Sequence, residues 1–396
     1  MKYILLVPDG AADEPLSELD GKTPLEVART PYLDDLARNG LVGTLEVTPP
    51  DMYPGSDAAN MALLGYDPTR YYTGRGPIEA AAMGLPMEAR DVAFRCSLIT
   101  TDGETLLDYS AGHITTDEAR PLIELANSKL GTRALTLFPG VSYRHILRWH
   151  DGPTDVQTHP PHENMGTLLS AIYPSGDGES RLRGFIEDSL NLLDDLPFNK
   201  QRRNQGKPPA NTLWPWSPGR VPQLPSFLSV RGVTGAVISA VDVVRGLGRL
   251  TGLEVVNVPG ATGYFDTNYE GKGKYALDAL SRHDFVWVHV EAPDEAGHAG
   301  NIDEKIRAIE NFDKLVVGTL LDGLKKLDDF RLLCAPDHKT PVSTRGHTIG
   351  PVPFLLYDSR KALRGGGHIP FDERALYEAK VRLPQGFRLI EDLFAQ

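Results

Sequence analysis

Three short apolar segments that each run into an aspartate constrain the fold of this chain most strongly. They span Lys2–Pro8, Asp284–Val290 and Phe330–Ala335. Runs of this length and composition are typical of buried parallel strands. In an open α/β sheet, ligand sites form beyond the carboxyl ends of such strands. The pattern therefore predicts an α/β fold in which polar residues from distant parts of the chain meet at one edge of a sheet.

Side chains that bind metals or phosphate follow these segments or lie in a tight loop. The set comprises three aspartates, three histidines and one serine: Asp9, Ser56, Asp294, His298, Asp337, His338 and His347. Mixed carboxylate and imidazole ligands suit borderline or hard divalent metals such as Mn²⁺ or Zn²⁺. Two such ions about 3.5–4 Å apart can clamp the attacking and leaving oxygens of an in-line displacement. A serine hydroxyl activated by a metal is a nucleophile, so the set predicts phosphoryl transfer with Ser56 as the attacking group.

Each of these residues taken alone also has an ordinary structural explanation. An aspartate after a strand is often a helix N-cap or a turn residue. Ser56 precedes a helical segment at Ala58–Leu64, so it is either a cap or a group that faces a phosphate at a helix N-terminus. The catalytic interpretation depends on the conjunction of all the residues in this order.

The order Asp, Ser, Asp-x-x-x-His, Asp-His, His resembles that of the alkaline-phosphatase superfamily. Longer sequence motifs resemble those of cofactor-independent phosphoglycerate mutase of the archaeal type, and the resemblance covers almost the whole chain. The motifs are GKTPLEVARTPYLD, PGSDAAN, YTGRGPIEAAAMG, VISAVDVVRG, VPGATGYFDTNYEGKG and EAPDEAGHAGN.

The resemblance implies a fold, a ligand pairing and a reaction. The fold would be an alkaline-phosphatase-like core with a mostly parallel sheet flanked by helices. One metal would be held by Asp294, His298 and His347, and the other by Asp9, Ser56, Asp337 and His338. Ser56 would carry the phosphoryl group while 3-phosphoglycerate and 2-phosphoglycerate interconvert without added bisphosphoglycerate. We expect Mn²⁺ as the metal, and Zn²⁺, Co²⁺ and Mg²⁺ also fit the ligand set.

Two departures from the family pattern keep a second enzyme class open. Asn60 stands where the family usually has a histidine close to the nucleophile, and Asp108–His113 reads DYSAGH instead of an arginine-rich word. The alternative is a metal-dependent phosphomonoesterase, or a phosphotransferase to another hydroxyl such as that of homoserine. A third class, a non-catalytic metal-binding protein, would be indicated if Ser56→Ala left all activity unchanged.

The positions of the ligands predict the domain organisation. None of the seven lies between residues 57 and 293. We therefore expect a discontinuous metal-binding core at 1–75 and 230–396, with an inserted α+β substrate-binding domain at 76–229. A domain of this kind would exclude water while an intermediate is held.

Several segments have a predicted structure of their own. Within the insertion, DVAFRCSLIT and RALTLFPGVSYRHILRW predict strands, and the amphipathic segments Asp117–Leu130 and Ser180–Leu196 predict helices. The proline-rich tract Gln201–Pro225 is predicted to be a substrate-side loop or a linker. In the core, Asn301–Leu327 predicts a further helical region.

Charge and composition restrict the partners. A formal net charge of −12 disfavours nucleic acid, so an anionic metabolite needs locally placed cations. The candidates are Arg95, His113, Arg144, His145, Lys207 and Lys272. Cys96 and Cys334 are expected to be reduced core residues. The first segment is expected to be a strand and not a signal peptide, and no run is long enough to span a membrane. We expect a cytoplasmic enzyme that acts on a small phosphorylated metabolite, with its oligomeric state open.

Overall fold

The structure is a computed structural model that describes residues 1–325, 329–363 and 369–395. The chain divides into two compact units, one formed by Met1–Tyr72 with Leu224–Gln396 and the other by Thr73–Gln223. We call them unit 1 and unit 2. Each has its own sheet and its own apolar core. That residues 76–229 are an inserted substrate-binding domain stays a prediction.

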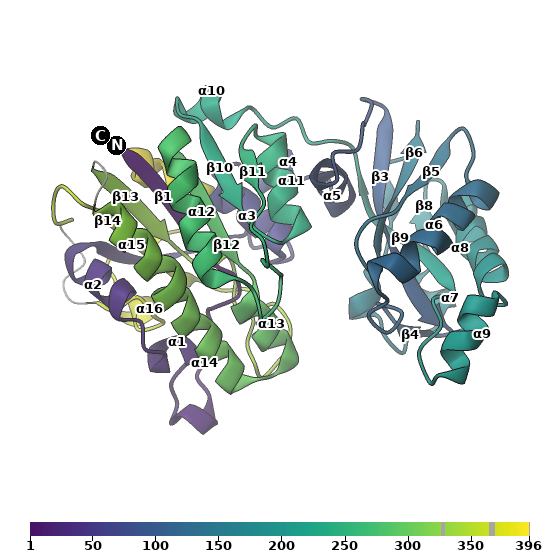
Figure 1. The fold of residues 1–396 in the computed structure, drawn as a ribbon, viewed down its shortest axis with the longest axis horizontal. Coiled ribbons are helices and arrows are strands. Elements are labelled where there is room, and N and C mark those ends of the chain that lie inside the picture. Colours follow the sequence, from purple (N-terminus) through teal and green to yellow (C-terminus); the bar gives the residue numbers. More distant parts are fainter. Residues whose placement is uncertain (326–328, 364–368, 396) are drawn as a thin grey trace. The chain divides into compact units, whose positions relative to one another are not determined.

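Unit 1 is built on an eight-stranded sheet (Figure 1). All pairings from β11 across to β13 are parallel, whereas β14 runs antiparallel to both of its neighbours, and β15 pairs parallel with β2. The predicted α/β fold with a mostly parallel sheet is therefore confirmed. The strand order is β11 (Glu254–Val256), β10 (Gly235–Ile238), β12 (Phe285–Val290), β1 (Lys2–Pro8), β13 (Phe330–Cys334), β14 (Val352–Asp358), β2 (Leu41–Leu45) and β15 (Arg382–Leu383).

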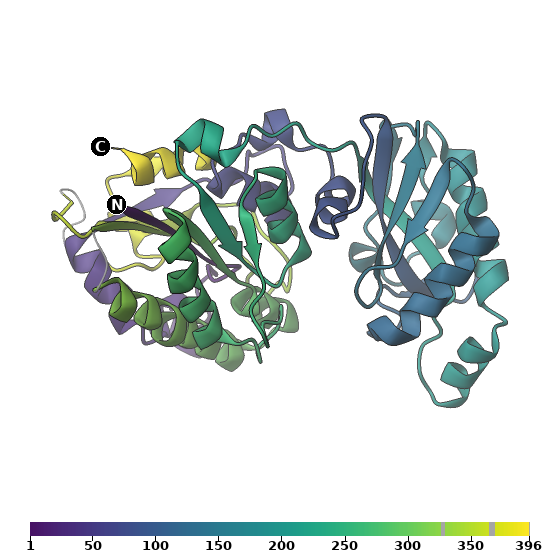
Figure 2. The same ribbon diagram turned by 45° about the horizontal axis from the view of Figure 1, so that its top comes forward.

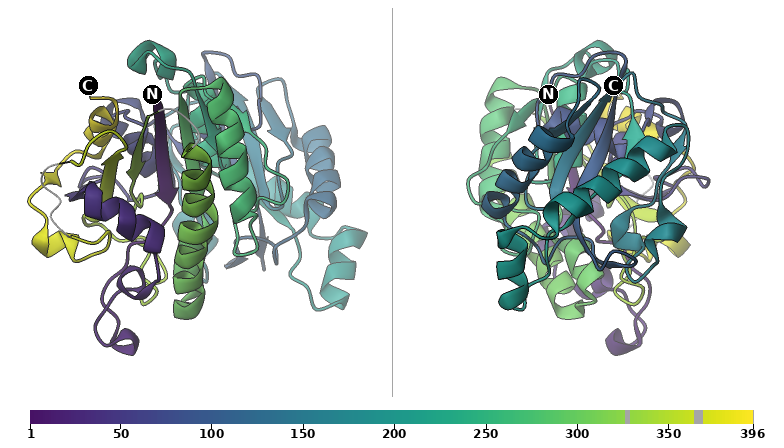
Figure 3. Two further views of the ribbon diagram at one scale, coloured as in Figure 1. Left: turned by 60° about the vertical axis from the view of Figure 1, so that its left-hand side comes forward. Right: turned by 90° about the vertical axis from the view of Figure 1, so that its right-hand side faces the viewer.

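Helices cover both faces of this sheet, because alternate residues of a strand point to opposite sides. In β10, Ala236 and Ile238 belong to the core that includes α2 (Pro31–Asn39), α12 (Tyr269–Arg282) and α15 (Gly318–Leu324). Val237 lies between them in sequence and packs against Gly248 of α11 (Asp242–Leu250). The left view of Figure 3 shows two long green helical stretches in front of the strands of unit 1, namely α12 and the continuous run from α14 (Ile302–Asn311) to α15.

The remaining helices of unit 1 are mostly short. They are α1 (Pro24–Val27), α3 (Ser56–Leu63), α4 (Pro68–Tyr71), α10 (Phe227–Arg231), α13 (Ala292–Ala299), α14 (Ile302–Asn311), α16 (Ala375–Glu378) and α17 (Leu389–Phe394). The region predicted as one helix from Asn301 contains α14, a π-helical segment at Phe312–Val317 and then α15, while Leu327 lies outside the described residues. Asp313 in the π-helical segment accepts hydrogen bonds from the backbone N–H groups of Tyr32 and Leu33 at the start of α2.

Unit 2 contains an antiparallel sheet with helices on both faces. Its strands run in the order β5 (Leu135–Phe138), β6 (Arg144–His150), β3 (Asp91–Thr101) and β9 (Thr212–Gly219), with β4 (Leu106–Asp108) paired to β3. Phe94 and Cys96 of β3 belong to the core with α6 (Thr116–Leu130) and α8 (Glu179–Leu193). Figure 2 shows these two helices on one face of the sheet. Ala93, the residue before Phe94, packs with Ala80 of α5 (Arg75–Ala82) on the other face.

The prediction that Gln201–Pro225 is a loop or linker is wrong. Its first residues belong to α9 (Pro197–Asn204), and its middle forms β9, where Trp214 and Trp216 are buried. Among the described strands, β9 pairs only with β3. Proline is tolerated at such an edge because no second neighbour needs its missing N–H group. Unit 2 also contains α7 (Leu169–Ile172) and a small pairing of β7 (Val156–Gln157) with β8 (Ser175–Gly176).

Two smaller expectations are also resolved. Cys96 and Cys334 are both buried and free, as predicted. Among the described residues, no helix combines the length and the apolar character needed to cross a membrane.

Candidate metal and phosphoryl-transfer site

The carboxyl ends of the parallel strands in unit 1 lie at one edge and bring the candidate ligands together. Pro8 of β1 is in register with Val290 of β12, and the N–H group of Asp9 donates to the carbonyl oxygen of Val290 at 3.0 Å. Gly10 has a φ of +60°, and a Cβ there would lie 2.6 Å from Oδ1 of Asp294. Only glycine fits this turn without strain, which explains the Asp9-Gly10 pair after β1.

The first group of ligands consists of Asp294, His298 and His347, and their candidate ligand atoms lie within 4.8 Å of one another. Asp294 lies in the first turn of α13 and His298 one turn later, so both side chains project from one face of the helix. The Nε2 atom of His298 is 3.3 Å from Oδ2 of Asp294, and Nε2 of His347 is 3.4 Å from Oδ1. The backbone oxygen of Arg345 is 3.0 Å from Nδ1 of His298 and fixes the orientation of this ring.

The electrostatics of this group reflect one carboxylate that faces two imidazoles. Burial raises the pKa of Asp294, but hydrogen bonds and charge from His298 and His347 outweigh it and hold the pKa well below its usual range. Burial lowers the pKa of His298, yet the Asp294 carboxylate raises it to about 9. One carboxylate that faces two imidazoles is a donor set that suits Mn²⁺, Zn²⁺ or Co²⁺, so the residues fit the predicted ion.

The second group contains Asp9, Ser56, Asp337 and His338, all of which are buried. The Nε2 atom of His338 lies 3.1 Å from Ser56 Oγ, 3.3 Å from Asp9 Oδ1 and 3.5 Å from Asp337 Oδ2. Within the described part of the chain, neither carboxylate oxygen of Asp9 has a hydrogen-bond partner. Burial, followed by the nearby charge of Asp337, raises the pKa of Asp9 well above its usual range. Unpartnered buried oxygens beside an imidazole fit a divalent cation.

The two groups adjoin each other. The rings of His338 and His347 have centroids 3.9 Å apart, and Asp9, Asp294 and His338 also offer ligand atoms within 4.8 Å of one another. The Oγ1 atom of Thr340 connects the groups, because it donates to Asp294 Oδ1 and lies 3.1 Å from Nδ1 of His338. The structure therefore brings all seven predicted side chains to one place, although their roles as ligands stay predictions.

Ser56 is the first residue of α3, with Gly55 as its N-cap. The N-terminus of a helix presents free N–H groups and a partial positive charge that favour a phosphate. One turn later, Nδ2 of Asn60 donates to the carbonyl oxygen of Ser56 at 3.0 Å and to Asp337 Oδ2 at 2.7 Å. Asn60, the residue that departs from the family pattern, thus connects the backbone of Ser56 to the candidate ligand Asp337.

Two polar residues of this site were not predicted. His289 and Glu291 come from the end of β12 and the turn after it, and burial lowers the pKa of His289 to about 3 and raises that of Glu291 to about 8. The available signal was a histidine inside the apolar run FVWVHV, where a polar residue needs a buried partner.

Unit 2 contains a separate cluster of guanidinium groups around one carboxylate. Arg95 of β3 projects to the face covered by α5, where its Nη1 atom and the Nε atom of Arg75 both contact Oε1 of Glu79. Arg95 also lies over the ring of Trp216, 5.1 Å from its centroid. Burial raises the pKa of Glu79, but Arg95 and Arg75 outweigh burial and hold it below its usual value. Arg75 and Glu79 were not among the predicted residues.

The six predicted substrate-binding residues come from both units, and three of them, Arg95, Arg144 and His145, lie on neighbouring strands of unit 2. Arg144 and His145 lie opposite Ser97 and Cys96 of β3, beside Arg95, and His145 is buried with its pKa lowered to about 3 by burial. His113 and Lys207 are exposed residues of unit 2. Lys272 belongs to unit 1, where it is fully buried and donates from Nζ to the carbonyl oxygen of His289 at 2.9 Å.

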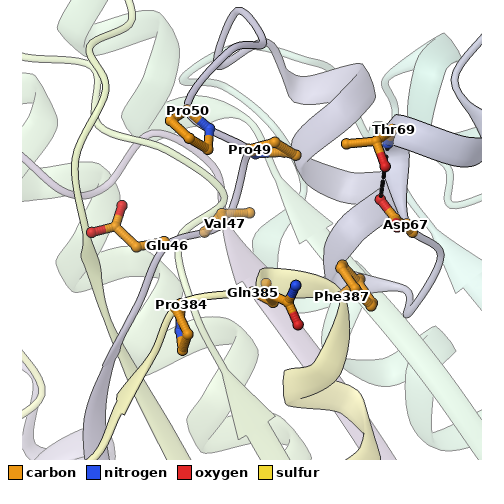
Figure 4. Close-up of a pocket in the computed structure, with 10 residues that line it drawn as sticks. Glu46, Val47, Pro49, Pro50, Asp67, Thr69, Pro384, Gln385 and Phe387 are labelled. Atoms are coloured by element: carbon orange, nitrogen blue, oxygen red, sulfur yellow. Dashed lines mark hydrogen bonds between the residues drawn. The ribbon is translucent and has the colours of Figure 1, made fainter.

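A surface pocket of unit 1 has no part in this chemistry. It has a volume of about 160 Å³ and is lined by Glu46, Val47, Pro49, Pro50, Asp67, Thr69, Pro384, Gln385, Gly386 and Phe387 (Figure 4). None of the seven candidate ligands is among these residues, and Asp67 is satisfied as the N-cap of α4.

Comparison with known proteins shows which family this chain resembles. The model of the 2,3-bisphosphoglycerate-independent phosphoglycerate mutase family matches residues 37–199. A probable 2,3-bisphosphoglycerate-independent phosphoglycerate mutase from Geobacter sulfurreducens is 47% identical over 395 residues, which cover 99% of this chain and 99% of that protein. The 2,3-bisphosphoglycerate-independent phosphoglycerate mutase of Methanosarcina acetivorans is 45% identical over 392 residues, which cover 98% of this chain and 98% of that protein.

Solved structures agree with the sequence comparison. A protein from Pyrococcus horikoshii is similar with a TM-score of 0.82 and 29% identity, over 100% of this chain and 98% of the other. A cofactor-independent phosphoglycerate mutase from Thermoplasma acidophilum is similar with a TM-score of 0.64 and 29% identity, over 99% of each chain. With the high identity over nearly the full length, this chain belongs to the 2,3-bisphosphoglycerate-independent phosphoglycerate mutase family.

Proposed function

We propose that this protein interconverts 3-phosphoglycerate and 2-phosphoglycerate through a phosphorylated Ser56 and without added bisphosphoglycerate. The observation that carries the proposal is the position of Ser56 Oγ. It lies at the N-terminus of α3 and 3.1 Å from Nε2 of His338, among the buried carboxylates of Asp9 and Asp337. Candidate ligands and helix N–H groups thus surround one hydroxyl, which is the proposed nucleophile.

The ligand groups would hold two divalent ions. Asp294, His298 and His347 would hold one, and Asp9, Ser56, Asp337 and His338 the other. Bound ions would supply Lewis-acid stabilisation of phosphoryl oxygens and lower the pKa of the serine hydroxyl. We propose Mn²⁺, and Zn²⁺, Co²⁺ and Mg²⁺ remain compatible alternatives. Thr340 would keep the ring of His338 in place through its contact with Nδ1.

The reaction balances without any co-substrate. The Ser56 oxygen forms a bond to the phosphorus of the substrate, the bond from phosphorus to the first glycerate oxygen breaks, and the serine proton passes to that oxygen. The other hydroxyl of the retained glycerate then attacks the phosphoserine, and its proton returns to Ser56. The only net change is the position of the phosphoryl group.

Cations of unit 2 would bind the anionic substrate. Arg75 and Arg95 both contact Glu79, and the charge of Arg144 also lowers the pKa of this carboxyl, so the guanidinium groups form a positively charged region that suits a carboxylate or phosphate. His145 adds an Nε2 atom that has no hydrogen-bond partner among the described residues. His113 and Lys207 stay candidates from the sequence. We propose a cytoplasmic role in glycolysis and gluconeogenesis, with small phosphorylated metabolites as partners.

Phosphorus NMR of 3-phosphoglycerate with the Mn²⁺-loaded protein tests the proposal. We expect 2-phosphoglycerate to appear without free phosphate, and we expect Ser56→Ala to abolish the reaction while metal binding is mostly kept. Ser229→Ala is the matched control, because Ser229 lies on the exposed α10. Free phosphate alone would indicate a phosphomonoesterase, and phosphorylation of added homoserine would indicate the phosphotransferase alternative. Full activity of Ser56→Ala would exclude the phosphoserine.

A further inference from the structure

The first chain crossing between the two units is the peptide bond from Tyr72 to Thr73, and a side chain fastens each of its ends. On the unit 1 side, the hydroxyl group of Tyr72 donates to Oδ2 of Asp57 at 2.6 Å. On the unit 2 side, Oγ1 of Thr73 donates to the carbonyl oxygen of Arg220 at 2.6 Å. The crossing therefore has almost no free chain, and a change of its backbone angles acts directly on Tyr72.

Asp57 is the residue after the proposed nucleophile, and it is buried. Its Oδ1 atom accepts a hydrogen bond from the N–H group of Ala58 at 2.9 Å, while Oδ2 accepts the one from Tyr72. A Cβ on Gly55 would lie only 2.7 Å from Oδ1. The carboxylate thus lies against the N-terminal turn of α3, whose N-cap is Gly55.

The second chain crossing, from Gln223 to Leu224, is held by the same part of unit 1. The hydroxyl group of Tyr66 donates to the carbonyl oxygen of Pro225 at 2.9 Å. Tyr66 is buried and lies between α3 and α4 in the chain. The segment from α3 to the end of α4 thus holds the unit 1 side of both crossings, and this segment begins with Ser56.

We propose that Asp57 is a positioning residue for the Ser56 hydroxyl, and that Tyr72 couples the Asp57 carboxylate to the first chain crossing. This inference rests on the proposed function, in which Ser56 attacks phosphorus. The two hydrogen bonds of the carboxylate connect the crossing to the first turn of α3. A displacement of a reacting group by about 1 Å can slow a reaction about 100-fold. The reactivity of Ser56 therefore depends on the conformation of the crossing.

Tyr72→Phe removes only the hydroxyl group and tests the coupling. With 3-phosphoglycerate and the Mn²⁺-loaded protein, we expect kcat to fall by about 10–100-fold. KM should stay nearly unchanged, because the contact positions the nucleophile and does not bind the substrate. Tyr71→Phe is the matched control, since it removes the hydroxyl group of the neighbouring tyrosine in α4, and its kcat should equal that of the wild type. A wild-type kcat in Tyr72→Phe would overturn the proposal.

Two variants of Asp57 separate positioning from helix stabilisation, because an acidic residue in a first turn also stabilises a helix. Asp57→Asn keeps an oxygen for the N–H group of Ala58 and offers Nδ2 to the oxygen of Tyr72, so it should retain most of the kcat. Asp57→Leu has no polar atom and should lose at least as much as Tyr72→Phe. A loss of stability in denaturant with an unchanged kcat would assign Asp57 a structural role alone.

The double variant tests whether the two residues act as a unit. Asp57→Leu combined with Tyr72→Phe should lose no more kcat than the more damaged single variant, because both changes break the same hydrogen bond. Losses that multiply would show that Asp57 and Tyr72 act independently, and would refute the coupling.

A second substrate separates failure of this proposal from failure of the proposed function. Hydrolysis of p-nitrophenyl phosphate requires the nucleophile but no glycerate, and absorbance measures the released nitrophenol. A wild type that hydrolyses this ester without converting 3-phosphoglycerate would refute the mutase, and Tyr72→Phe should then still slow the hydrolysis. Wild-type mutase activity that Tyr72→Phe leaves unchanged would refute the coupling alone. A wild type that is inactive on both substrates would refute both proposals.

Discussion

Two buried groups of charged residues lie in unit 1, and they differ in how their charges are matched. The paired cluster consists of Asp13, Lys305 and Glu373, and the ligand cluster of Asp9, Ser56, Asp337 and His338. In the paired cluster, Nζ of Lys305 donates to Asp13 Oδ2 at 2.7 Å, and Glu373 accepts from Thr23 Oγ1 at 2.5 Å. In the ligand cluster, both oxygens of Asp9 are without a hydrogen-bond partner among the described residues.

The difference separates a structural role from a functional one. Lys305 also donates to the carbonyl oxygens of Ala12 at 3.3 Å and Thr340 at 2.8 Å, so it ties the segment after β1 to the segment after β13. These segments carry ligands of the site. A buried charge that is paired and hydrogen-bonded is tolerated in a stable fold, whereas an unpaired one is not. The ion pair of Asp13 with Lys305 therefore fits a structural role, whereas the unpartnered oxygens of Asp9 fit a cation from solution.

Removal of the charge in the paired cluster should have the largest effect on stability. Lys305→Met leaves the Asp13 carboxylate buried without its cation, and we expect a loss of about 3–5 kcal/mol in the free energy of unfolding. Denaturant unfolding monitored by fluorescence measures it. Lys325→Met is the control, since Lys325 pairs with Asp322 on the surface and the change should not be measurable. Equal stability of both variants would show that the paired cluster is not structural.

The pH dependence of stability should reveal Glu373 in the same cluster. Burial raises its pKa from 4.5 to about 7, against hydrogen bonds from Thr23 and Asp13. Between pH 4.5 and 7 the folded state therefore binds more protons than the unfolded state, and the stability of the wild type falls as pH rises through this window. We expect Glu373→Gln to gain on the order of 3 kcal/mol relative to the wild type from pH 4.5 to 7.5.

Unfolding curves at several pH values test this gain. The exposed Glu378 provides a matched control, because Glu378→Gln should run parallel to the wild type at every pH. A constant difference between Glu373→Gln and the wild type across the window would contradict a raised pKa at this position.

Neutralisation of Asp9 in the ligand cluster should change the stability with the opposite sign to Lys305→Met. Asp9→Asn removes a buried carboxylate whose oxygens have no hydrogen-bond partner among the described residues, so the metal-free protein should gain about 1–3 kcal/mol in stability. Turnover should fall by more than about 100-fold, because mutation of a residue that only supports a metal ligand already lowers metal affinity or activity by about 10–100-fold. Thermal unfolding in chelator and a mutase assay with Mn²⁺ measure the two effects. Asp20→Asn, on the exposed surface, should change neither. Loss of stability in Asp9→Asn would end the contrast between the clusters.

Local sequence predicted those parts of the fold and site that depend on short-range patterns. Lys2–Pro8 was predicted as a strand, and β1 has the same bounds. The Asp-x-x-x-His order of Asp294 and His298 is a short-range pattern, and the structure places both residues on one face of α13. The α/β class followed from the apolar runs, because hydrophobic patterning determines which strands are buried.

Features that depend on a distant partner were not predicted. His289 lies in an apolar strand, and only the position of Asp9 on the neighbouring strand makes it part of the site. Lys305 looks like an ordinary charged residue of an amphipathic helix until its contacts with Asp13 and Thr340 are seen. The strand β9 was missed because its prolines suggest a loop, and its edge position depends on pairing with β3.

Asn60 offers the smallest and most selective test of the ligand cluster. Its Nδ2 atom donates to Asp337 Oδ2 at 2.7 Å, so Asn60→Ala should weaken metal binding by about 10–100-fold with little change in fold. Titration calorimetry with Mn²⁺ measures the affinity, and saturating Mn²⁺ should restore most of the turnover. Asn60→His, which returns the residue usual in the family, should bind metal more tightly than Asn60→Ala if a ring nitrogen reaches Asp337. A turnover deficit that Mn²⁺ does not correct would instead place Asn60 in direct contact with the substrate.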